Sequence, residues 1–191
     1  MKNKDDITDL QPWIEEAHQV EYDCGWFSVH RHDRRSQVSQ VKHDFYLIET
    51  SNWVNVVPVL ADGRVLFVRQ YRQSAEIFSL EVPAGIVEPD EDPLEAGRRE
   101  LLEETGFGDG DWTALGSFFS NPALIRNRVL PFLALNVVQK GKMQPDAEEE
   151  LELIALSRTE IEDAIRKGLI HNAITIAVLH KAFLHSPGSQ S

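Results

Sequence analysis

Apolar residues gather along this chain in short runs and helix-spaced sets that predict a mixed α/β protein. Residues 53–60 and 65–72 are apolar runs that predict strands, and Asp62-Gly63 between them is typical of a hairpin turn. Further strands are predicted near 78–83, 113–119, 128–138 and 151–156. Three helices are predicted: one over about 93–105, one that begins at Ser157, and one over about 172–185. This order of elements suits a mixed sheet packed between helices.

The residues ahead of this domain have a different pattern. Residues 1 to about 18 are polar with a few apolar positions, a spacing that predicts a short amphipathic helix. From Glu21 to about Glu49 apolar positions alternate in two runs, which predicts a small antiparallel sheet. We therefore divide the chain into N-terminal strands over 1–50, a main domain over 51–185 and a mobile tail over 186–191.

One predicted helix carries an unusual concentration of negative charge. Glu100 and Glu104 are four residues apart, so their carboxylates project side by side, and Glu103 lies one turn from Glu100. Such like-charge pairs destabilise a helix by roughly 0.2–0.5 kcal/mol each. A hard divalent cation would turn this repulsion into coordination, because Mg²⁺ takes carboxylate oxygens and shares its coordination shell with substrate phosphates. A solvated acidic face is the alternative that the helix alone leaves open.

Charge and cysteine content narrow the class of protein. The formal net charge of −12 over 191 residues argues against nucleic acid or an anionic membrane as a partner. Cys24 is the single cysteine, so the chain forms no intrachain disulfide, and we expect a reducing compartment. We expect Cys24 to be a small buried hydrophobe. No apolar run approaches the length of a membrane span and the N-terminus lacks a signal-peptide core, so we expect a cytoplasmic protein.

The fixed residues around the acidic helix resemble the Nudix box. In order they are Gly85, five residues, Glu91, seven residues, Arg99-Glu100-Leu101, one residue, Glu103-Glu104, one residue, Gly106-Phe107. The resemblance implies a Nudix-type α/β/α sandwich with a mixed sheet, preceded here by the small N-terminal antiparallel sheet. It also implies a hydrolase of diphosphate bonds that uses Mg²⁺, with Mn²⁺ as the alternative ion.

Features outside the box are similar to those of ADP-ribose pyrophosphatases and related nucleoside diphosphate sugar hydrolases. They are the run Glu81 to Gly85, the run Arg69 to Arg72, Pro122 placed 16 residues after Gly106, and the run Gly168 to Ala173, in which Asn172 replaces the usual Asp. The resemblance covers roughly residues 25–184. It implies cleavage of ADP-ribose to AMP and ribose 5-phosphate, and a homodimer that pairs through the N-terminal strands.

Other readings of the same residues stay open at this point. The box recognises a diphosphate and not its substituents, so GDP-mannose, dinucleoside polyphosphates and NADH are alternative substrates. A Nudix fold that binds a nucleotide sugar without cleaving it is an alternative of another class, although all the box carboxylates are present here. A monomer is the alternative to the homodimer, and in a monomer the N-terminal strands would simply extend the core.

The resemblance also assigns roles to individual residues of the box. The expected metal ligands are Glu100, Glu103, Glu104 and the backbone carbonyl of Ala84. Gly85, Glu91, Arg99 and Gly106 are expected to be structural, with Arg99 paired to Glu91 so that the loop is fixed on the helix.

Roles outside the box are assigned to a smaller set of residues. The expected water-orienting residue is Glu149, in the acidic loop 146–150, with Glu148 and Glu150 as alternative registers, and Glu103 completes the catalytic set. Arg72 is the expected phosphate clamp, since guanidinium binds phosphate with two parallel hydrogen bonds. Pro122 is an expected substrate contact. Trp26, Phe27 and Arg31 are candidates to stack on the nucleoside, with core or dimer contacts as the alternative, and Trp26 and Arg31 are the expected contacts. The seven histidines show no ligand spacing, so His30 and His32 are interpreted as ordinary strand residues.

Overall fold

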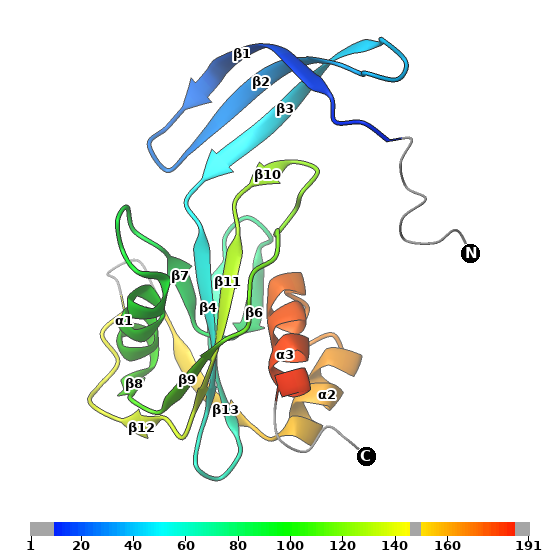
Figure 1. Cartoon of the computed structure of the whole chain (residues 1–191). Coiled ribbons are helices and arrows are strands. Elements are labelled where there is room, and N and C mark those ends of the chain that lie inside the picture. Colours follow the sequence, from blue (N-terminus) through cyan, green and yellow to red (C-terminus); the bar gives the residue numbers. More distant parts are fainter. Residues whose placement is uncertain (1–9, 146–149, 186–191) are drawn as a thin grey trace. The chain divides into compact units, whose positions relative to one another are not determined.

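A computed structural model describes residues 10–145 and 150–185 (Figure 1). Within them the chain forms two compact units. The N-terminal unit comprises the described residues up to Ser51 together with 121–127, and the main unit comprises 52–120 and the described residues from Arg128 onward. The N-terminal unit is therefore not the single contiguous segment that we expected, because 121–127 returns to it. The tail expected over 186–191 lies outside the described residues.

The N-terminal unit is a four-stranded sheet with the strand order β1-β2-β3-β10. Its strands are β1 (Ile14–Asp23), β2 (Phe27–Arg35), β3 (Lys42–Thr50) and β10 (Ile125–Arg126). The first three strands pair antiparallel, and β10 pairs with β3 in parallel. The predicted small N-terminal antiparallel sheet is thus present.

Two expectations for the N-terminal unit are wrong. The helix predicted up to residue 18 is wrong over residues 14–18, which lie in β1. Two register shifts interrupt the pairing of β1 with β2, and they disturb the two-residue alternation that identifies a strand. Cys24, expected to be buried, is exposed in the turn between β1 and β2, where its thiol donates to the carbonyl of Phe27 at 3.4 Å.

The main unit is built on a seven-stranded mixed sheet. Its path is β13-β5-β4-β11-β9, and β6 and β7 add to β5 and β4 respectively. The bounds are β4 (Trp53–Val59), β5 (Val65–Arg72), β6 (Ile77–Glu81), β7 (Ala84–Ile86), β9 (Asp111–Ala114), β11 (Val129–Leu135) and β13 (Glu152–Leu156). Only the β4–β11 pair among these described strands is parallel. A separate short pair joins β8 (Phe107–Gly108) to β12 (Val138–Gln139).

Helices cover both faces of this sheet (Figure 1). Helix α1 (Pro93–Thr105) packs on one face, where Leu101 is fully buried with Val54 and Val56 of β4. Helices α2 (Arg158–Arg166) and α3 (Ala173–His185) pack on the other face with Val57. Neighbouring residues of β4 thus enter opposite cores, as the alternation of a strand requires. The predicted α/β/α sandwich with a mixed sheet is confirmed.

None of the helices in the described residues combines the length and the apolar character needed to cross a lipid bilayer.

Candidate active site

Helix α1 begins and ends where its sequence provides caps. The carboxylate of Asp92 accepts hydrogen bonds from the N–H groups of Leu94 and Glu95 at 2.9 and 3.4 Å, and Pro93 occupies the first helical position. At the other end Gly106 has φ 73°, a left-handed conformation that glycine adopts without strain. These caps fix which residues of α1 face the sheet.

A glycine in the middle of α1 brings the helix close to the sheet. A Cβ atom at Gly97 would lie 3.2 Å from a methyl carbon of Val54 and 3.3 Å from the ring of Trp112. The absence of a side chain at this position therefore sets the distance between α1 and β4.

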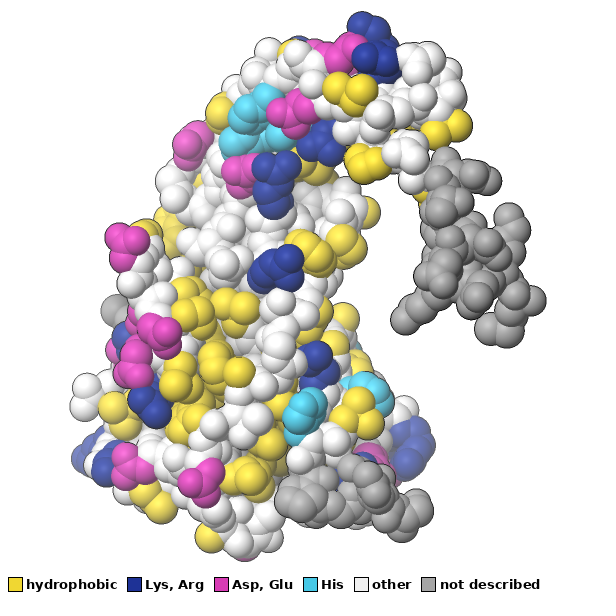
Figure 2. Space-filling view, viewed as in Figure 1, with side chains coloured by type: hydrophobic (Ala, Val, Ile, Leu, Met, Phe, Trp, Pro, Cys, Tyr) yellow, Lys and Arg dark blue, Asp and Glu magenta, His cyan; other side chains and the backbone are white. Residues whose placement is uncertain are grey.

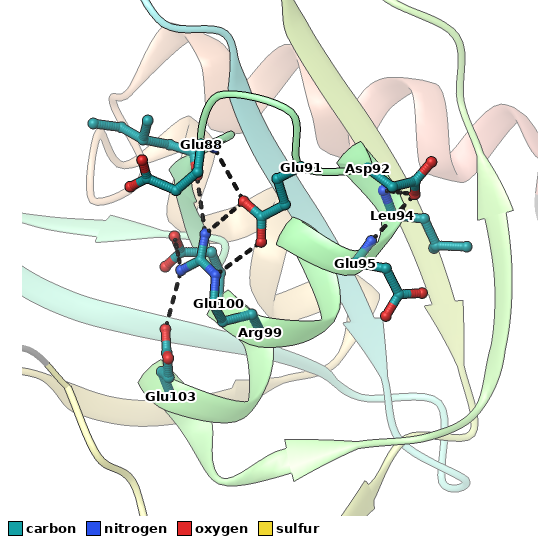
Figure 3. Close-up of polar contacts among 9 residues, drawn as sticks. Glu88, Glu91, Asp92, Leu94, Glu95, Arg99, Glu100 and Glu103 are labelled. Carbon is teal, nitrogen blue, oxygen red and sulfur yellow. Dashed lines mark hydrogen bonds and ion pairs between the residues drawn. The ribbon is translucent and has the colours of Figure 1, made fainter.

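Arg99 is the centre of a network of carboxylates on α1 and the loop before it (Figure 3). Its Nε and Nη2 donate to both oxygens of Glu91 at 3.0 and 3.1 Å. Its Nη1 donates to Glu100 at 2.8 Å and to Glu103 at 3.2 Å, and Nη2 also donates to the carbonyl of Ile86 at 3.1 Å. The hydrogen bonds with Arg99 hold the pKa of Glu91 below its usual value, and those with Glu91 raise the pKa of Arg99.

The carboxylates of α1 lie against the backbone of β7. Glu104 is only 2% exposed, and its Oε2 accepts the N–H of Ala84 at 3.1 Å. Glu100 occupies the space beside Gly85, where a Cβ atom would lie 1.9 Å from Oε1 of Glu100. The structure therefore brings together Ala84, Gly85, Glu100 and Glu104, as the sequence spacing implied.

This arrangement fits a bound divalent cation. The carboxylates of Glu91, Glu100 and Glu103 converge around the single guanidinium of Arg99, and Glu104 lies against β7 on the same helix, so these four carboxylates exceed the one guanidinium by three formal negative charges. Clustered carboxylates of low exposure repel one another, and the side chain of Glu100 is only 15% exposed. Hard oxygen donors of this kind suit Mg²⁺.

A cavity of about 670 Å³ lies in the main unit, and it is connected to the carboxylates of α1 through Ala84 and Gly85 of β7, which lie against Glu104 and Glu100. Its lining includes Asn55, Arg72, Glu81, Ala84, Gly85 and Asn172. The guanidinium of Arg72 donates to the two oxygens of Glu81 at 3.0 and 2.8 Å. Burial alone would raise the pKa of Glu81, but hydrogen bonds from Arg72 and Ser79 outweigh it and lower this pKa. Glu81 therefore stays ionised and fixes the orientation of Arg72 at the cavity.

Two asparagines of the cavity were missed as site residues by sequence reasoning. Asn55 interrupts an otherwise apolar strand, and its Oδ1 is buried without a hydrogen-bond partner among the described residues. An unsatisfied buried oxygen is costly, which is a signal for a ligand donor at this point. Asn172 lines the cavity together with Glu81 and contributes to the lowered pKa of that carboxyl, so the residue that replaces the usual Asp belongs to the same polar wall.

The other predicted site residues lie elsewhere. Trp26, Arg31 and Pro122 belong to the N-terminal unit, so their expected contacts with a nucleoside stay predictions. Trp26 is 75% exposed, and Nε of Arg31 lies 3.1 Å from a carboxylate oxygen of Asp33. Glu148 and Glu149 lie outside the described residues, whereas Glu150 is exposed and belongs to no helix or strand.

Replacing Gly85 by alanine is expected to lower activity much more than stability. The new Cβ would collide with the tip of the flexible Glu100 side chain, which can rotate away at small energetic cost but then leaves the cation site. We expect turnover to fall by roughly 10²-fold and the unfolding midpoint in urea to change little. Gly141→Ala is the matched control, because a Cβ there meets no atom within 4 Å. Equal turnover of the two variants would contradict the assigned position of Glu100.

The fold is an α/β/α sandwich in which one acidic helix packs against a strand that lines a cavity. This combination indicates the class of hydrolases that depend on a cation. A family model for the NUDIX domain matches residues 52–175, so the chain belongs to the NUDIX domain family.

Relatives and solved structures agree with this assignment. An ADP-ribose pyrophosphatase of Bacillus subtilis (strain 168) is 33% identical over 115 residues, 59% of this chain and 60% of the relative. The ADP compounds hydrolase NudE of Escherichia coli (strain K12) is 30% identical over 96 residues, 50% of this chain and 48% of the relative. The match therefore spans about half to three fifths of these relatives. A crystal structure of an ADP compounds hydrolase has a TM-score of 0.81 at 22% identity, covering 92% of this chain and 94% of that chain, which shows the fold.

Proposed function

We propose that this protein hydrolyses the diphosphate bond of nucleoside diphosphate sugars, with ADP-ribose as the favoured substrate and AMP and ribose 5-phosphate as products. The observation that carries the proposal is the set of carboxylates on α1 packed against β7, whose residues Ala84 and Gly85 also line the 670 Å³ cavity. The B. subtilis relative is an ADP-ribose pyrophosphatase and the E. coli relative is an ADP compounds hydrolase, which supports the choice of an ADP compound over the other nucleotides.

The proposed cofactor is Mg²⁺, with Mn²⁺ as the alternative ion. Glu100, Glu103, Glu104 and the carbonyl of Ala84 are the residues that would hold it. Bound there, the ion supplies neutralisation of the diphosphate charge and a lowered pKa for a coordinated water. Arg99 orients Glu100 and Glu103 through its hydrogen bonds, and Glu91 holds Arg99 in place.

Residues around the cavity have separate proposed tasks. Arg72, oriented by Glu81, binds a phosphate of the substrate. The buried Oδ1 of Asn55 accepts a hydrogen bond from a substrate hydroxyl or a water. Glu149 orients the attacking water together with Glu103, while Trp26 and Arg31 contact the nucleoside and Pro122 contacts the substrate.

We also propose a homodimer that forms through the N-terminal sheet. This unit exposes large apolar side chains that a free monomer would leave in water, among them Val20, Tyr22, Trp26, Phe27, Val41 and Tyr46. Sedimentation at micromolar concentration is expected to give twice the chain mass. Sedimentation at the chain mass would exclude the dimer and leave the activity proposal intact. The single cysteine favours a reducing compartment such as the cytoplasm.

Product analysis over a panel of substrates tests the proposed activity. The panel contains ADP-ribose, ADP-glucose, UDP-glucose, GDP-mannose, a dinucleoside polyphosphate and NADH, each with Mg²⁺. We expect the highest turnover with ADP-ribose, with AMP and ribose 5-phosphate released in equal amounts. Faster cleavage of another compound in the panel would identify that compound as the preferred substrate in place of ADP-ribose. Tight binding without turnover of any member would identify a sensor and not an enzyme.

A further inference from the structure

The N-terminal sheet carries a cluster of three histidines that the proposed activity does not use. His18 of β1 and His30 and His32 of β2 each offer a ring nitrogen, and these three nitrogens lie within 4.8 Å of one another. Figure 2 shows histidine side chains gathered at the surface of this sheet, with charged side chains beside them. Our interpretation of His30 and His32 as ordinary strand residues therefore missed a grouping of potential metal ligands.

Strand geometry creates the cluster. His30 and His32 are two residues apart in β2, so both side chains lie on one face of the strand. His18 pairs directly with His32 in the β1–β2 register, which places it on the same face. The third histidine therefore joins the other two only when the strands pair, and the sequence spacing does not reveal it.

Neighbouring side chains determine which nitrogens are available for a ligand. Nδ1 of His32 lies 2.6 Å from Oε2 of Glu15, and because a carboxylate only accepts, this nitrogen carries the hydrogen. In the neutral imidazole the lone pair of His32 is then on Nε2. Nε2 of His30 lies 2.6 Å from the hydroxyl of Ser28 and 3.8 Å from Glu49. Nδ1 of His30 and Nε2 of His18 share a hydrogen bond of 2.7 Å, and a metal ion bound by both nitrogens would replace its hydrogen.

The Nε2 atom of His32 is the observation that points most directly to metal binding. His32 is only 2% exposed, and its Nε2 is buried without a hydrogen-bond partner among the described residues. Burying such an acceptor without a partner is costly. A metal ion would satisfy this lone pair. A carboxylate on the far nitrogen of a metal-binding histidine is the usual way in which its tautomer and orientation are fixed, and Glu15 occupies that place here.

We propose that His18, His30 and His32 bind one transition-metal ion, for which Zn²⁺ is the representative. Imidazole nitrogens suit Zn²⁺, Cu²⁺ or Ni²⁺, whereas Mg²⁺ and Ca²⁺ prefer oxygen donors, so this site is chemically distinct from the carboxylates of α1. Bonds of about 2.0–2.1 Å in a tetrahedral site place the nitrogens roughly 3.4 Å apart. The ring of His18 is stacked on those of His30 and His32, so metal binding requires it to rotate out of this arrangement to bring the nitrogens, now up to 4.8 Å apart, around one ion. Because His18 is exposed, solvent supplies the fourth position.

The ion would fasten an exposed edge of the sheet. All ten residues of β1 are exposed, and β1 lies at one end of the strand order. A metal ion held by His18 of β1 and by His30 and His32 of β2 joins the two strands through side chains as well as backbone hydrogen bonds. Zinc is therefore expected to slow amide hydrogen exchange in β1.

Zinc binding to the metal-stripped whole protein tests the proposal. Competition with a chromophoric chelator, with Mg²⁺ in excess to occupy the carboxylates of α1, should reveal one tight Zn²⁺ per chain. We expect His30→Ala and His32→Ala each to weaken binding by at least about 100-fold, and Glu15→Gln to weaken it by about 10–100-fold. His43→Ala is the matched control, since His43 is an exposed histidine of the neighbouring strand β3, and it should bind zinc within about twofold of wild type.

Two outcomes would overturn the site. One is the absence of tight zinc binding to wild type under these conditions, and the other is unchanged binding by folded His32→Ala. If the histidine variants fail to fold, zinc-edge X-ray absorption of the wild-type complex decides, because nitrogen neighbours at about 2.0–2.1 Å support the site and an all-oxygen shell refutes it. Neither readout involves nucleotide turnover, so failure here leaves the proposed function standing.

Discussion

Glu104→Gln is expected to lower diphosphate hydrolysis by roughly 10³-fold, equivalent to about 4 kcal/mol of activation free energy. Glu104 is 2% exposed and accepts the N–H of Ala84, so its charge lies in a region from which water is largely excluded. Glutamine keeps the shape and can accept the same hydrogen bond, but it removes one negative charge from the cation site. The fold should persist while the affinity for the cation and the turnover fall.

Steady-state kinetics with saturating Mg²⁺ and ADP-ribose measure this effect. Glu95→Gln is the matched control, because Glu95 is an exposed glutamate of the same helix that pairs with Arg98 at 2.6 Å. We expect this control to retain wild-type turnover, and circular dichroism should be unchanged in both variants. Comparable losses in the two variants, or none in either, would remove Glu104 from the cation site.

Arg99→Gln is expected to reduce both stability and turnover. Arg99 donates five hydrogen bonds, four of them to the carboxylates of Glu91, Glu100 and Glu103. Removing one partner from a buried ion pair costs about 3–5 kcal/mol. Because the side chain of Arg99 is 35% exposed, solvent screening reduces this to about 2 kcal/mol of unfolding free energy. Turnover should fall by at least about 10²-fold, since Glu100 and Glu103 lose the group that orients them.

Urea unfolding without added metal, followed by a turnover assay, checks both parts. Arg98→Gln provides the comparison, because this neighbouring arginine forms a half-exposed ion pair with Glu95. Its unfolding free energy should stay within about 0.5 kcal/mol of wild type. If Arg99→Gln were no less stable than Arg98→Gln, the network around Arg99 would not be what holds the loop on α1.

Local sequence determines much of this site, and for that reason it was predictable. The caps at Asp92 and Gly106 fix the bounds of α1, and helical geometry then places Glu100 and Glu104 side by side. The contact between Arg99 and Glu91 likewise spans only eight residues. The sandwich followed from the order of apolar runs, because each face of the sheet needs a helical cover.

Features that depend on pairing between distant strands were harder to predict. Proline is normally confined to the edge of a sheet or to a bulge, yet Pro58 lies in β4, an interior strand of the sheet. On one side β4 pairs with β7 over residues 53–55 and with β5 only at Val59, so Pro58 falls where this ladder is interrupted. The return of residues 121–127 to the N-terminal sheet, through the pairing of β10 with β3, had no local signal either.

The missed site residues share the same cause. Asn55 becomes informative only once its buried oxygen is seen beside the cavity, and the histidine cluster requires the register that pairs His18 with His32. A single sequence reports hydrophobic periodicity and turn chemistry well, whereas cross-strand register is set by the whole sheet.

The initial rate of AMP release from ADP-ribose, measured while Mg²⁺ is raised from a chelated start, tests the central claim most directly. The claim is that the carboxylates of α1 hold the cation on which hydrolysis depends. We expect no release above background in chelator and a saturable rise with Mg²⁺ in wild type. In Glu104→Gln the rise should be shifted to higher Mg²⁺ and reach a much lower maximum. A rate that is unaffected by chelation, or a Glu104→Gln curve that overlays the wild-type curve, would contradict it.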